Sequence, residues 1–146
     1  QIGRLDANGN PMATSNIADP EQVRRYLQLC DPDFLAVGIG NAHGFYKGEP
    51  DIHLEVLEQV RTFTDIPFVL HGCTGMNEEM IQKSKQYGVA KINFGTQVRH
   101  NYMCYLREGC AMDFQDHCWK LSQFAEKKLR EDIKQMIRLA GSEGKA

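Results

Sequence analysis

The stretch "IPFVLHGCTGMNEEMIQKSKQYGVAKINFG" (residues 66–95) decides the fold class. It begins with an apolar run at 66–70, which is typical of a strand buried on both faces. Residues 77–88 are predicted to form a helix that Asn77 caps at its N-terminus. A second apolar run at 89–95 completes a strand–helix–strand unit. Such a unit predicts two parallel strands joined by a right-handed crossover.

The same alternation continues on both sides of this stretch. The expected further elements are helices at 19–29, 52–63, 96–109 and 119–139 and a strand at 34–40. Asp19 is a candidate N-cap with Pro20 at the first helical position, and Thr96 is a candidate N-cap of its helix. The order predicts an α/β fold with a parallel sheet, which is either an open doubly wound sheet or part of a (β/α)8 barrel.

The composition is that of an ordinary globular domain. The 146 residues include 42% hydrophobic and 25% charged residues, and the formal net charge is -2. Without a basic excess we expect no nucleic acid or anionic membrane as a partner. No apolar run reaches the ~18 residues that a membrane helix needs. The five cysteines form no CxxC pair, which favours free thiols in a reducing cytoplasm. The opening residues predict a fragment with a strand already under way at Gln1.

Three of the expected strands end in residues that can carry chemistry. His43 and Gly44 follow the first strand, His71 and Gly72 the second, and Asn93 lies near the end of the third. Because the carboxyl ends of parallel strands meet at one edge, the two imidazoles could bind one zinc ion. The alternative is that each histidine is only hydrogen-bonded within the fold.

The segment "GCTG" (72–75) resembles an anion-binding loop, because backbone N–H groups and the start of a helix follow the strand directly. Cys73 could be a reactive thiol at this position, but packing of a small residue is the simpler interpretation. His53, His100 and His117 are expected at the surface.

Four segments together resemble a known family. They are "AHGFYKGEP" (42–50), "VLHGCTG" (69–75), "KINFGT" (91–96) and "GSEGKA" (141–146). Their order and spacing look like the C-terminal half of the class II, metal-dependent ketose-bisphosphate aldolases, which include fructose-bisphosphate and tagatose-bisphosphate aldolases.

The resemblance implies a (β/α)8 barrel, of which residues 1–146 would form a single partial domain. They would supply the end of the fifth strand through the eighth strand and the terminal helices. It also implies a cytoplasmic lyase of carbohydrate metabolism, as in glycolysis, that cleaves a ketose bisphosphate or condenses dihydroxyacetone phosphate with an aldehyde. A homodimer or homotetramer is expected of the complete protein.

Carried over residue by residue, His43 and His71 match two zinc ligands. The positions that match the family's substrate-binding residues are Gly44, Gly72, Cys73, Thr74, Asn93, Phe94, Gly95 and Thr96. Some of the glycine and threonine positions also serve a monovalent cation, Na+ or K+, in relatives. The resemblance therefore implies Zn2+ as cofactor and a sugar phosphate as substrate.

The sequence also departs from the family pattern. Gln1 stands where relatives carry a glutamate metal ligand, and Gly9 stands near the place of an acid–base glutamate, with only Asp6 as a nearby carboxylate. Gln97 stands where an acidic residue often follows the threonine. The third zinc histidine and a catalytic aspartate belong to the family's other half, so we assign no catalytic residue within this chain. Two hypotheses remain: half of an aldolase, or a non-catalytic sugar-phosphate-binding or assembly module.

Overall fold

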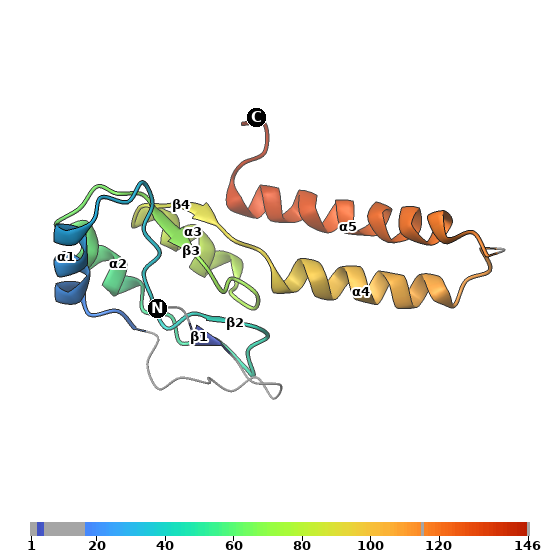
Figure 1. The fold of residues 1–146 in the computed structure, drawn as a ribbon, viewed down its shortest axis with the longest axis horizontal. Coiled ribbons are helices and arrows are strands. Elements are labelled where there is room, and N and C mark those ends of the chain that lie inside the picture. The colour runs from blue at the N-terminus through green and yellow to red at the C-terminus, as the bar shows by residue number, and fades with distance from the viewer. Residues whose placement is uncertain (1–2, 5–16, 115, 146) are drawn as a thin grey trace. The chain divides into compact units, whose positions relative to one another are not determined.

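Two units make up the chain, Gln1–Phe94 and Gly95–Ala146 (Figure 1). The computed structural model describes residues 3–4, 17–114 and 116–145. The departures from the family pattern at Gln1, Asp6 and Gly9 lie outside the described residues.

The first unit contains the predicted alternation of strands and helices. Its elements are β1 (Gly3–Arg4), α1 (Pro20–Leu29), β2 (Ala42–His43), α2 (Leu54–Arg61), β3 (Phe68–Leu70), α3 (Glu78–Gln86) and β4 (Val89–Ile92). β1 pairs with β2 and β3 pairs with β4, both in parallel. A further parallel bridge joins Leu35 to Phe68. Neighbouring segments therefore follow one another in chain order, and the predicted parallel pairing is confirmed.

The prediction of a continuous strand at 34–40 is wrong. This segment makes only isolated bridges, at Leu35 and Ile39. The chain turns at Gly40, whose φ of 90° lies in the region that favours glycine. The N–H of Ile39 is also taken by the side chain of Asn41, at 3.1 Å, so it is not available to a neighbouring strand. Local backbone conformation thus ends the ladder earlier than the apolar pattern indicates.

The core of the first unit lies between the strands and their crossover helices. The most deeply buried apolar side chains are Ile39, Leu57, Val60, Phe68, Leu70 and Ile81. α2 faces this core with four buried residues, whereas α1 buries no residue completely. α1 instead lies beside α2 (Figure 1), where the guanidinium of Arg24 stacks 4.1 Å from the ring centre of Phe63.

Two of the three predicted N-caps are confirmed. The carboxylate of Asp19 accepts the N–H of Glu21 at 3.0 Å, and the side chain of Asn77 accepts the N–H of Met80 at 2.8 Å. The prediction that Thr96 caps the fourth helix is wrong. Thr96 is the first helical residue and Gly95 is the cap. The hydroxyl of Thr96 accepts from the side chain of Arg99, at 3.5 Å, instead of a backbone N–H.

The second unit is a pair of antiparallel helices, α4 (Thr96–Cys110) and α5 (Cys118–Ala140) (Figure 1). The helices approach closely at Gly109, where a Cβ would collide with Leu121. Farther along, the carboxylate of Asp132 on α5 accepts from Asn101 and Tyr105 on α4, at 2.8 and 2.7 Å. Throughout the described ranges, no helix has the length and apolar character needed to cross a membrane.

Candidate functional site

The structure brings three of the predicted site residues together at the carboxyl ends of neighbouring strands. His43 ends β2, His71 follows β3 directly, and Asn93 follows β4 directly. The ring centres of His43 and His71 lie 5.5 Å apart, at an interplanar angle of 63°. The amide nitrogen of Asn93 lies 3.2 Å from Nε2 and 3.3 Å from Nδ1 of His71. These three side chains form the candidate site.

The two histidines differ in environment. His43 is exposed, whereas His71 is half-buried. Burial lowers the pKa of His71, and the nearby charges of His43 and Lys91 lower it further. A lowered pKa keeps the imidazole of His71 neutral near pH 7, and the neutral form is the one that binds a metal. Among the described residues, no group of three or more His, Cys, Asp or Glu side chains could hold a metal ion.

The two loops that carry the histidines are joined by a buried side chain that the sequence interpretation missed. We call residues 39–46 and 70–75 the site loops. Asn41 is fully buried, with an exposed fraction of 0%. Its oxygen accepts the N–H of Ile39, and its amide donates to the carbonyl of His71 at 2.7 Å. The only sequence signal was a polar residue within an apolar run, two positions before His43.

Tyr46 forms a second link between the site loops and was also missed. Its hydroxyl accepts a hydrogen bond from the N–H of Ala42 at 2.6 Å. The same hydroxyl can donate to the carbonyl oxygen of Ala42, at 3.1 Å, or to that of Gly72, at 3.3 Å. Burial raises the pKa of Tyr46, while the hydrogen bond from Ala42 opposes that shift. The hydroxyl therefore stays protonated and keeps its donor.

Gly72 lets the two loops touch. Its φ is 64°, and a Cβ on Gly72 would lie 2.5 Å from the carbonyl oxygen of Ala42. Any larger residue would push the loop that bears His71 away from the loop that bears His43. Gly44, next to His43, also has a positive φ, of 130°.

The predicted anion loop has its side chains inside the fold. Cys73 is 4% exposed and Thr74 is 5% exposed. Burial raises the pKa of the Cys73 thiol to about 12, and its sulfur lies 3.6 Å from the carbonyl oxygen of Leu70. The structure therefore favours packing over a reactive thiol for Cys73. All five cysteines are free, as predicted.

The remaining predicted site residues lie at the boundary of the units. Phe94 is the last residue of the first unit and is half-buried. Gly95 and Thr96 open the second unit as the cap and first residue of α4. Of the predicted residues, the structure therefore groups the side chains of His43, His71 and Asn93, and it places Gly72 at the contact between the two site loops.

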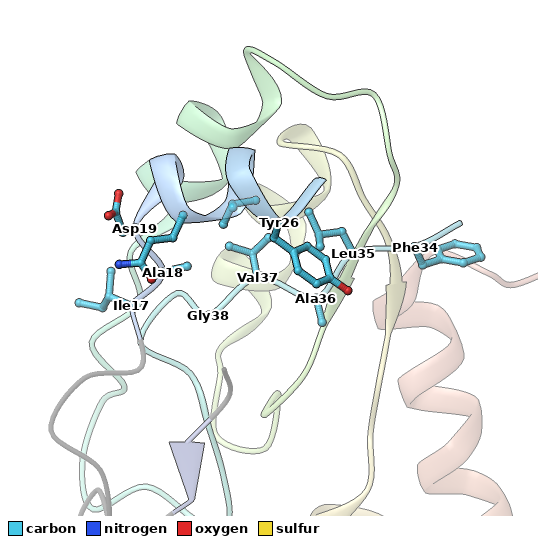
Figure 2. Close-up of a pocket in the computed structure, with 11 residues that line it drawn as sticks. Ile17, Ala18, Asp19, Tyr26, Phe34, Leu35, Ala36, Val37 and Gly38 are labelled. Atoms are coloured by element: carbon cyan, nitrogen blue, oxygen red, sulfur yellow. The ribbon is translucent and has the colours of Figure 1, made fainter. Parts of the chain in front are cut away.

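A cavity of about 550 Å³ in the first unit lies apart from these residues (Figure 2). It lies between α1 and the segment 34–38, with Tyr26 on the helix side and Phe34 and Leu35 on the other. Among the described residues that line it, the one carboxylate, Asp19, is engaged as the cap of α1. None of these described lining residues is a histidine, so they offer none of the imidazole chemistry of the strand ends.

Comparison with known proteins agrees with this geometry. The sequence model of the class-II fructose-bisphosphate aldolase family matches residues 1–145. The protein YdjI of Escherichia coli K12 is 34% identical over 145 residues, which are 99% of this chain and 51% of YdjI. The chain therefore belongs to the class-II fructose-bisphosphate aldolase family, a family of lyases, and the predicted kinship is confirmed. It spans about half the length of this curated relative.

Solved structures show the same half-length match. The crystal structure of the YdjI aldolase from Escherichia coli K12 superposes with a TM-score of 0.74 at 32% identity, covering 88% of this chain and 46% of that chain. A crystal structure from Coccidioides immitis gives a TM-score of 0.78 at 22% identity, covering 98% of this chain and 51% of that chain. The mixed α/β fold is thus that of about half an aldolase chain.

Proposed function

We propose that the chain is the C-terminal half of a (β/α)8 barrel that carries part of an aldolase active site. The support is the order of the parallel segments: β1 pairs with β2, the segment at Leu35 bridges β3, and β3 pairs with β4. Consecutive parallel strands that neighbour one another in chain order are the arrangement of such a barrel. Barrel enzymes place their chemistry at the carboxyl ends of the strands, where His43, His71 and Asn93 lie.

The two imidazoles fit a zinc ion. Two imidazoles on one tetrahedral zinc, with Zn–N bonds of about 2.0 Å, hold their ring centres about 5 Å apart. The separation of 5.5 Å between the rings of His43 and His71 is close to this value. Burial also favours the neutral, metal-binding form of His71. Zinc bound here would polarise the carbonyl group of a substrate as a Lewis acid.

The surrounding residues favour a phosphorylated sugar as substrate. The loop from Gly72 to Gly75 leads into α3, and backbone N–H groups at such a position bind phosphate well. Since the side chains of Cys73 and Thr74 are buried, the backbone would make the contact. Asn93 would donate a hydrogen bond to a substrate oxygen beside His71. The expected reaction is the reversible aldol cleavage of a ketose bisphosphate to dihydroxyacetone phosphate and an aldehyde.

The single observation that carries this proposal is the convergence of His43, His71 and Asn93 at neighbouring strand ends. It is tested by a zinc-dependent aldol cleavage assay on the complete protein, with fructose and tagatose bisphosphates as substrates. Turnover that a chelator abolishes and zinc restores is expected. The 146-residue chain alone is expected to show no turnover, because its described residues supply only two grouped imidazole ligands.

The second candidate is a sugar-phosphate-binding or assembly module without catalysis. Gln1 and Gly9, at the places where relatives carry glutamates, favour this function. It predicts that the complete protein binds dihydroxyacetone phosphate, measured by calorimetry, but does not cleave any ketose bisphosphate. The monovalent cation, the oligomer and the cytoplasmic location remain predictions under either function.

A further inference from the structure

Lys91 contacts the candidate site from β4. Lys91 and Asn93 are two residues apart, so their side chains leave the same face of the extended chain. Opposite them, Val69 pairs with Lys91, and His71 follows two residues after Val69. The ammonium nitrogen of Lys91 donates to the side-chain oxygen of Asn93 at 2.8 Å. Lys91, Asn93 and His71 thus form a continuous row of contacts.

The row fixes which way the amide of Asn93 points. A lysine ammonium is only a donor, so the atom that it contacts must be the amide oxygen. The amide nitrogen is then directed at the ring of His71, 3.2 Å from Nε2. Without a donor at Lys91, the oxygen and nitrogen of Asn93 could exchange places by a rotation of the amide. That rotation would turn an acceptor, instead of a donor, toward His71.

The ammonium of Lys91 is available for this contact. In the parts of the chain that the structure describes, none of the salt bridges involves Lys91. The side chain is exposed, so it makes this contact without the cost of a buried charge. Its hydrogen bond to an amide oxygen is charge-assisted, which makes it stronger than one between neutral groups.

We propose that Lys91 is a positioning residue, which holds the amide of Asn93 with its donor toward His71 and toward a substrate oxygen bound there. This inference rests on the proposed aldolase function for its effect on turnover. Its structural part, the orientation of the amide, stands without that function. Lys91 itself need not touch the substrate.

The test compares three lysine variants of the complete protein. Lys91→Met removes the donor but keeps the length of the side chain, Lys91→Arg keeps a donor, and Lys83→Met removes an exposed lysine on α3 as a matched control. We expect kcat to fall about tenfold in Lys91→Met, since a positioned hydrogen bond of this kind is worth roughly that factor. KM should change little, Lys91→Arg should recover most of kcat, and Lys83→Met should match the parent.

A double variant separates positioning from a general structural effect. In an Asn93→Ala background Lys91→Met should cost nothing more, because Lys91 acts through Asn93. An equal loss of kcat in both backgrounds, or an unchanged kcat in Lys91→Met, would overturn the inference.

A spectroscopic measurement keeps this inference distinct from the proposed function. In protein labelled with 15N-asparagine, nuclear Overhauser effects should link the side-chain amide protons of Asn93 to the ring of His71. These signals should disappear in Lys91→Met and return in Lys91→Arg. Their persistence in Lys91→Met would refute the positioning of the amide, even if aldol cleavage is detected. Their loss in a protein without aldolase activity would support the positioning and reject the proposed function alone.

Discussion

The site loops of the first unit and the helix pair of the second unit are stabilised in different ways. The site loops contain little regular structure and are joined by the side chains of Asn41, which is buried, and Tyr46, which is half-buried. The helices α4 and α5 satisfy their backbones internally and meet through close packing at Gly109 and partly exposed polar contacts at Asp132. In the site loops, individual side-chain hydrogen bonds thus take the place of a regular ladder.

The largest expected difference between the two regions is in thiol reactivity. The pKa of Cys73 in the site loops is raised to about 12, whereas Cys110 on α4 is exposed. Compared with an ordinary thiol of pKa about 8.5, this shift lowers the thiolate fraction at pH 8 by about a thousandfold. Iodoacetamide should therefore alkylate Cys110 far faster than Cys73 in the folded protein, as followed by mass spectrometry of peptides. Rates within tenfold of each other would show that the site loops open readily.

Substitution of one asparagine in each region tests how much its hydrogen bonds contribute to the free energy of unfolding. Asn41→Ala leaves the buried N–H of Ile39 without its partner, at about 1–3 kcal/mol, and the carbonyl of the half-buried His71 without its donor, at about 1 kcal/mol. We expect the free energy of unfolding to fall by about 2–4 kcal/mol. Asn101→Ala in the second unit removes contacts to Gln97 and Asp132 that water can replace, since all three residues are only half-buried. Its cost should be about 1 kcal/mol.

Urea denaturation of both variants measures this difference. An equal loss of stability in Asn41→Ala and Asn101→Ala would mean that the link between the site loops is no stronger than a contact on the surface of a helix pair.

A substitution at Gly109 tests the role of close packing in the second unit. The added methyl of Gly109→Ala would overlap Leu121 and approach Phe124 at 3.1 Å. Overpacking costs about 1–3 kcal/mol, of which the better helix propensity of alanine offsets about 1 kcal/mol. A net loss of up to about 2 kcal/mol on thermal unfolding is expected, whereas Cys110→Ala at the exposed neighbouring position should be nearly neutral. A stabilised Gly109→Ala variant would show that the helices do not meet there.

The smallest expected effect is a dependence on pH at His53, which lies before α2. Its Nδ1 is 2.7 Å from Glu55 and its Nε2 is 3.3 Å from Asp51. The hydrogen bond to Glu55 is the main cause that raises the pKa of His53; desolvation opposes the shift, and the hydrogen bond to Asp51 adds to it. Because the pKa of His53 is higher in the folded than in the unfolded protein, protonation of His53 stabilises the fold. This contribution is fully present below the pKa of the unfolded state, about 6.5, and is lost as the pH rises through the pKa of the folded state.

The wild-type advantage over His53→Gln should therefore shrink between about pH 6 and pH 8, as measured by urea denaturation across that range. An advantage that grows with pH would contradict the assigned ion pairs.

The sequence predicted most of the helices, because their signals are local. Asp19 and Asn77 mark helix starts by hydrogen bonds to residues two or three positions away, and Pro20 has the fixed φ that suits a first helical position. The apolar runs at 66–70 and 89–95 likewise predicted parallel strands, which the structure shows as β3 and β4. The break within 34–40 was missed, because it depends on the conformation of Gly40 and on a side chain that competes for a backbone N–H.

The site was predicted in part. His43, His71 and Asn93 were expected at strand ends, and the parallel pairing brings them together. Asn41 and Tyr46 were not expected, because their partners on the second site loop lie 30 and 26 residues away in the sequence. No local pattern reports such a contact. The amide orientation of Asn93 likewise follows only from the position of Lys91 in the folded chain.

The central claim, that His43 and His71 hold one metal ion, is tested most directly by the zinc content of the complete protein. We predict one zinc per chain in the parent protein and a loss of zinc in both His43→Ala and His71→Ala, with the fold of each checked by circular dichroism. His100→Ala, at an exposed position of α4, should retain the metal. Full zinc content in His43→Ala and His71→Ala would contradict the account.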